Sequence, residues 1–129
     1  MQLFDIIPSD FFKPLTGINR REYIDIITLI WQRCKRSPIY GESKTMVLDW
    51  LEEYFAGLHQ KIPFDPDDLS DFRGEEPASQ SPRFYAAMFL RRLKDTGWLE
   101  EREGSYEEEA LIVVNHRIVP IIRAFHDIV

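Results

Sequence analysis

The stretch SPRFYAAMFLRRLKDTGWLEEREGSYEEEALIVV, residues 81–114, decides the fold of this chain. Ser81 offers a hydroxyl to the free N–H groups of a first helical turn. Pro82 suits that turn because its missing N–H costs nothing there and its fixed φ is already helical. Gly97 stands where a left-handed residue would close the helix. These signals predict a helix over 82–95 with a sharp end.

Two extended runs follow the helix, at 98–103 and 110–114, around a turn that contains Gly104 and Ser105. Helix, Gly-Trp and hairpin form the outline of the second half of a winged helix, in which the helix is the recognition helix and the hairpin is the wing. We therefore predict a mostly α-helical fold with a small β-hairpin, a winged helix-turn-helix.

Three further helices are expected from periodic apolar residues. The first covers 19–35, where Asn19 and Glu22 resemble a capping box. The second covers 43–60. The last begins just before Pro120, because proline is tolerated only in a first turn.

The chain is long enough for one domain and too short for two ordinary ones. Residues 1–18 form an arm with many large apolar side chains, which should pack on the domain or on a partner, and residues 19–129 form the winged-helix domain. An acidic loop is expected at 61–80. The last helix reaches Val129 without a stop signal, so we expect a fragment of a longer chain.

The composition excludes several classes of protein. The longest apolar runs are far too short to span a bilayer, and the first residues lack the pattern of a signal peptide, which favours the cytoplasm and no membrane. The single cysteine, Cys34, is expected to be a small apolar core residue. His59, His116 and His126 fit no metal-ligand spacing, and no catalytic motif is present. We therefore expect no catalytic residue, no metal and no cofactor.

The net charge of −6 is unevenly distributed. Residues 62–78 and 98–109 are strongly acidic, so the rest of the chain is net positive and its cations gather on the predicted helices. Arg33, Lys35 and Arg36 fall at the end of one helix, where compensation of the helix dipole is favoured over a DNA contact.

DNA binding by the helix at 82–95 is the main alternative to a protein-interaction role. Four cations lie on or near this helix and could reach guanine edges: Arg83, Arg91, Arg92 and Lys94. Two features oppose it. Residues 84–90 are apolar around the whole helix, and the predicted wing carries six glutamates, which would repel a phosphate backbone.

The surplus of apolar side chains instead favours a second protein surface against this helix, most simply another copy of the chain around a two-fold axis. The predicted interface of this homodimer combines aromatic and apolar residues of the arm and of the helix. These are Phe4, Phe11, Phe12, Phe84, Tyr85, Met88 and Phe89.

Three segments also resemble a known family. They are LFDIIPSDFFKPLTGINRREYID at 3–25, LRRLKDTGWLEEREGSYEEEALIV at 90–113 and RIVPIIRAF at 117–125. On these residues the chain resembles the amino-terminal part of the Wadjet JetA family, the MukF-like kleisin subunits of bacterial SMC complexes.

The resemblance implies an amino-terminal winged-helix domain that mediates kleisin dimerisation. It places the domain in a plasmid-defence complex with an SMC ATPase, a MukE-like subunit and a topoisomerase-like nuclease. Such complexes extrude DNA and cleave small circular plasmids, and catalysis belongs to other subunits. The ATPase and the MukE-like subunit would be bound through regions outside this chain, so contact with DNA would be indirect. The alternative function is that of a winged-helix DNA-binding transcriptional regulator.

Overall fold

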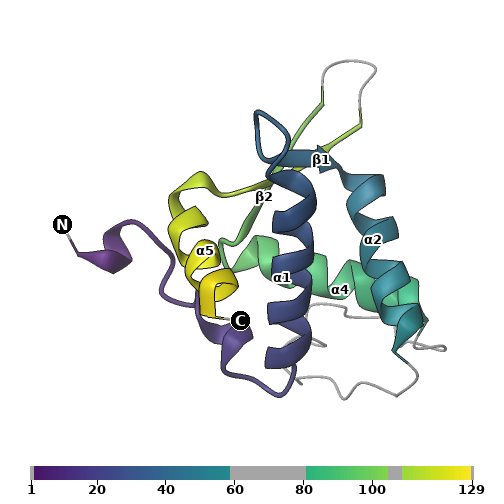
Figure 1. The fold of residues 1–129 in the computed structure, drawn as a ribbon, viewed down its shortest axis with the longest axis horizontal. Coiled ribbons are helices and arrows are strands. Elements are labelled where there is room, and N and C mark those ends of the chain that lie inside the picture. Colours follow the sequence, from purple (N-terminus) through teal and green to yellow (C-terminus); the bar gives the residue numbers. More distant parts are fainter. Residues whose placement is uncertain (1, 59–80, 105–108, 129) are drawn as a thin grey trace.

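Four α-helices and a small antiparallel sheet make up the described part of the chain, residues 2–58, 81–104 and 109–128 of a computed structural model (Figure 1). The helices are α1 (Arg20–Cys34), α2 (Lys44–Gly57), α4 (Pro82–Asp95) and α5 (Val119–Ile128). The strands are β1 (Gly41–Ser43), β2 (Leu99–Arg102) and β3 (Leu111–Val114). Short 3-10 turns are η1 (Leu3–Asp5), η2 (Lys13–Leu15) and η3 (His116–Ile118). The expectation of a mostly helical fold with a small β-structure is confirmed. The predicted acidic loop at 61–80 lies outside the described residues.

Strand β1 is the element that sequence patterns missed. The sheet has the order β1–β3–β2, so β1 adds a third strand to the predicted hairpin. Gly41 pairs with Val113, and a Cβ on Gly41 would lie 2.8 Å from the carbonyl oxygen of Ile112. Glycine allows this close approach of two backbones. From the sequence alone, the same glycine predicts an interruption of regular secondary structure.

Helix α4 has the predicted bounds. The hydroxyl of Ser81 accepts a hydrogen bond from the N–H of Phe84 at 3.1 Å, which caps the first turn. At the other end Gly97 has φ of +95°, and the N–H of Trp98 donates to the carbonyl of Leu93 at 3.0 Å. This bond, with that from Gly97 to Lys94, is the Schellman arrangement. The start and stop signals therefore act as expected.

The cap expected at the start of α1 is absent, whereas the turn η3 before α5 is capped. Asn19 precedes α1, but its side chain makes no capping hydrogen bond, so the predicted capping box is wrong. The backbone of Asn19, at φ −100° and ψ 21°, is not in the extended conformation that directs a side chain toward the first turn. In contrast, Asn115 accepts a hydrogen bond from the N–H of Arg117 at 3.1 Å, and Pro120 sits in the first turn of α5 as predicted.

The core forms where α4 crosses α1 and α2 (Figure 1). The ring of Phe89 lies 4.5 Å from that of Tyr23 on α1 and 4.8 Å from that of Phe55 on α2. Tyr85 lies 5.4 Å from Phe55. Two helices of its own chain thus cover α4, and this burial supplies the main hydrophobic stabilisation.

The N-terminal arm packs on the domain rather than floating free. The ring of Phe11 stacks on the indole of Trp98 with centroids 4.0 Å apart. The indole N–H of Trp98 donates to the carbonyl of Phe11 at 2.7 Å. Both side chains are fully buried. The arm therefore belongs to the core at the C-terminal end of α4.

Candidate functional site

The first turn of the arm carries apolar side chains into solvent. Leu3, Phe4 and Ile6 have 52%, 58% and 40% of their surface exposed. The turn is closed locally, because the carboxylate of Asp5 accepts a hydrogen bond from the N–H of Gln2 at 3.1 Å. We call Leu3, Phe4 and Ile6 the arm patch. Adjacent exposed apolar side chains of this size are typical of an interaction surface.

The predicted interface residues divide into surface and core. Tyr85, Met88 and Phe89 are at most 6% exposed, and rings of α1 and α2 cover Tyr85 and Phe89. The sequence-based inference was that this helix carries more apolar side chains than its own chain can cover. That inference is incorrect, because the chain itself provides more than one covering surface. Phe11 is also fully buried. On the surface are Phe4, which is exposed, and Phe12 and Phe84, which are half-buried.

Three of the four cations predicted for DNA contact pair with carboxylates of the same chain. Arg83 lies 2.9 Å from Asp49 and 3.0 Å from Glu52, both on α2. Lys94 lies 3.0 Å from Glu101 on β2. The other two are also on α4: Arg91, 4.0 Å from Asp95, and Arg92, which is half-buried. The acids beside Arg83, Arg91 and Lys94 reduce the local positive potential that DNA binding by this helix would need.

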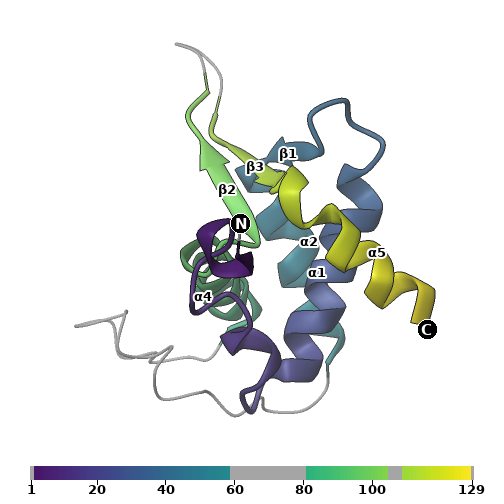
Figure 2. The ribbon, with the colours of Figure 1, turned by 90° about the vertical axis from the view of Figure 1, so that its left-hand side faces the viewer.

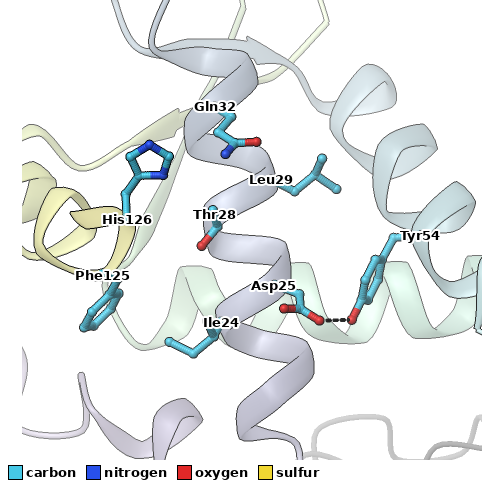
Figure 3. A pocket seen from close by; sticks show the side chains of 8 residues that line it. All are labelled: Ile24, Asp25, Thr28, Leu29, Gln32, Tyr54, Phe125 and His126. Carbon is cyan, nitrogen blue, oxygen red and sulfur yellow. Dashed lines mark hydrogen bonds between the residues drawn. The ribbon is translucent and has the colours of Figure 1, made fainter. Parts of the chain in front are cut away.

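A groove runs along the outer face of α1, with α2 on one side and α5 on the other (Figure 3). Its volume is about 440 Å³. The lining combines apolar and uncharged polar side chains with one carboxylate and one imidazole: Ile24, Asp25, Thr28, Leu29, Gln32, Tyr54, Phe125 and His126. The groove is the right size for a few side chains of a binding partner.

One hydrogen bond crosses the groove between two helices. The hydroxyl of Tyr54 on α2 donates to the carboxylate of Asp25 on α1 at 2.7 Å (Figure 3). Burial raises the pKa of Tyr54 well above its usual range, and the hydrogen bond to Asp25 raises it further. Tyr54 therefore stays a neutral donor that fixes one wall of the groove.

The sequence predicted the helices that line the groove, but not the groove itself. Ile24, Tyr54 and Phe125 belong to apolar residues that repeat at helical spacing, a pattern that predicts burial. Ile24 and Leu29 are apolar residues of α1 outside the stripe that faces the core, and this position could have indicated a second contact surface. Which helices flank that surface depends on how α2 and α5 pack.

The described residues offer no metal centre, since no group of three or more His, Cys, Asp or Glu lies close enough to bind an ion. Cys34 is buried, as expected for an apolar core residue, and burial raises the pKa of its thiol to about 11. The thiolate is then scarce at neutral pH, so the group is unreactive.

Among the described residues, no helix has the length and apolar character needed to cross a membrane.

Comparison with known proteins identifies the family. Neither the curated proteins nor the solved structures contain a match. A family model for Wadjet protein JetA matches residues 29–129. The match contains two of the three segments that carried the resemblance and begins after the third, at 3–25. It covers well over half of the chain and spans all four helices except the first turns of α1. The chain therefore belongs to the JetA family, part of the Wadjet anti-plasmid defence system.

Proposed function

We propose that this chain is a non-catalytic protein-interaction and dimerisation module of the winged-helix type, within a kleisin-like subunit of an SMC-type complex. Among the described elements, the order helix, strand, helix, helix, strand, strand, with a sheet of order β1–β3–β2, supports the winged-helix assignment. The kleisin assignment and the partners, an SMC ATPase and a MukE-like subunit, rest on the resemblance to the family.

The arm patch is the observation that carries the dimerisation proposal. Leu3, Phe4 and Ile6 are held on a turn whose following residues are anchored by Phe11 on Trp98. The patch is therefore presented on an ordered base, and a partner does not have to order a free tail. This lowers the entropic cost of association.

The arm patch alone is too small for a stable dimer. A specific interface buries roughly 800 Å² on each partner, more than three partly exposed side chains supply. We infer that the groove of Figure 3 completes the interface by receiving the arm patch of the second copy. A two-fold axis then produces two equivalent arm-to-groove contacts.

Light scattering on the chain at tens of micromolar tests this function. The wild type is expected to be a dimer, and the double variant Leu3→Ser with Phe4→Ser a monomer. The matched control is Ile39→Ser with Met46→Ser, which removes two side chains of similar exposure (46% and 45%) elsewhere and should leave the dimer intact. A monomeric wild type contradicts the proposal.

The variant Thr28→Glu tests the contribution of the groove. Thr28 is half-buried on the outer face of α1, so a carboxylate there changes the groove without removing a core side chain. We expect a weaker dimer, because the charge would be desolvated on association. A dimer of unchanged strength would restrict the interface to surfaces other than the groove.

A further inference from the structure

A second depression, separate from the arm patch, gathers cations from two parts of the chain. It lies between the C-terminal end of α1, the connection that leads to β1, and α5, and has a volume of about 530 Å³. Lys35 and Arg36 directly follow α1, and Arg123 comes from the middle of α5. We call these three residues the basic patch. The rest of the lining is Trp31, Tyr40, His126 and Asp127.

One cation of the patch contacts a pair of aromatic side chains. The guanidinium of Arg123 lies over the ring of Trp31, 5.9 Å from its centroid, and Tyr40 lies 5.5 Å from the same ring. Tyr40 has φ of +55°, which is an outlier for a bulky residue. Its carbonyl accepts a hydrogen bond from the N–H of Val114 at 2.9 Å, so the sheet maintains this backbone conformation. The patch therefore has a rigid base.

The cations of the basic patch are available to a ligand. Lys35, Arg36 and Arg123 are exposed, and across residues 2–58, 81–104 and 109–128 none of them forms an ion pair. This distinguishes them from Arg83 and Lys94 on α4, which face acids. Compensation of the dipole of α1 accounts for two of the cations, but not for Arg123, which belongs to another helix.

The basic patch also lies apart from the acidic hairpin. In Figure 2 the connection between α1 and β1 and helix α5 lie on the right, and strand β2 lies on the left. Strand β2 therefore lies on another side of the molecule, and its Glu101 pairs with Lys94 of α4, so the charge of this carboxylate acts on α4 more than on the patch.

We propose that the basic patch binds the phosphate backbone of duplex DNA. Backbone contacts require several cations on an open surface and no deep pocket. An acidic protein segment is less favoured, because tight protein contacts need an apolar or aromatic anchor, and Trp31 is already covered, with 4% of its surface exposed. This site does not lie on helix α4, where the sequence placed the possible DNA contacts.

Fluorescence anisotropy with a labelled duplex of about 20 base pairs, at several salt concentrations from about 50 mM, tests the proposal. The patch variant is Lys35→Gln, Arg36→Gln and Arg123→Gln. The matched control is Arg91→Gln, Arg92→Gln and Lys94→Gln, which removes the same charge from α4. Because Arg123→Gln also removes a contact to Trp31, circular dichroism checks the fold, and the double variant Lys35→Gln with Arg36→Gln repeats the test with two exposed side chains.

The wild type should bind duplex DNA in a strongly salt-dependent way. The patch variant should bind at least about tenfold more weakly at low salt, and its log–log salt slope should be shallower by about 3, one for each lost phosphate contact. The control should change by less than about threefold. Absence of wild-type binding at low salt, or an equal loss in both triple variants, would overturn the proposal. So would binding of a labelled poly-glutamate peptide at the patch without binding of the duplex.

Discussion

Gly97 is the residue at which the long helix ends and the sheet begins. Its φ of +95° is readily adopted only by glycine, and it allows the turn that sends Trp98 back into the core. A Cβ at this position would also lie 2.9 Å from two ring carbons of Pro8 in the arm. One glycine therefore serves both the helix end and the docking of the arm.

We predict that Gly97→Ala lowers the free energy of unfolding by roughly 1–3 kcal/mol, because backbone strain and a contact with a rigid ring add together. The control is Gly57→Ala at the end of α2, where a Cβ meets nothing within 4 Å. That change should be neutral or stabilising by up to about 1 kcal/mol. Urea denaturation followed by circular dichroism measures both. Equal effects at the two positions would contradict this reading of Gly97.

At the scale of elements, strand β2 is joined to two helices through one carboxylate. Glu101 lies 2.9 Å from the ammonium of Lys44 at the start of α2 and 3.0 Å from that of Lys94 on α4. Hydrogen bonds from Lys44 and then from Lys94 hold the pKa of Glu101 below its usual value. The ionised form is thus the one that links the strand to both helices.

This linkage predicts a pH-dependent contribution to stability. Because the pKa of Glu101 is lower in the folded state, its stabilisation is present above the unfolded pKa of about 4.5 and is lost as the pH falls through the lower folded value. At neutral pH Glu101→Gln should cost about 0.5–1 kcal/mol, as expected for a partly exposed pair. The difference between wild type and variant should shrink below the normal glutamate range in urea titrations. A difference that is independent of pH would exclude the ionic contribution.

At the scale of the whole molecule, the arm and the domain share one core. Phe11 and Trp98 are 87 residues apart in the sequence, and they are joined by ring stacking and by a hydrogen bond from the indole N–H. Sequence reasoning separated an arm at 1–18 from a domain at 19–129, and their packing makes cooperative unfolding the expected behaviour.

We predict that Phe11→Ala costs about 3–5 kcal/mol, because it leaves a cavity against Trp98 inside the core. Phe4→Ala, at a position 58% exposed, should change stability by less than about 0.5 kcal/mol when measured on the monomer. Thermal unfolding should remain a single transition in both variants. A separate early transition in the wild type would show that the arm unfolds independently.

The sequence by itself determined where the main elements begin and end. Ser81, Pro82 and Gly97 set the bounds of α4, and Pro120 set the start of α5, because caps and fixed φ angles act within a few residues. The family was also recognisable from short segments, and the match over 29–129 confirmed it.

Only the tertiary structure decided which apolar side chains face solvent. Phe89 is a core residue because rings of α1 and α2 pack against it, whereas Phe4 is exposed because the arm anchors to the core only at Phe11. The third strand and the basic patch likewise depend on segments far apart in the chain. Periodicity reports that a face is apolar, but burial depends on the element that covers it, and no local signal encodes that partner.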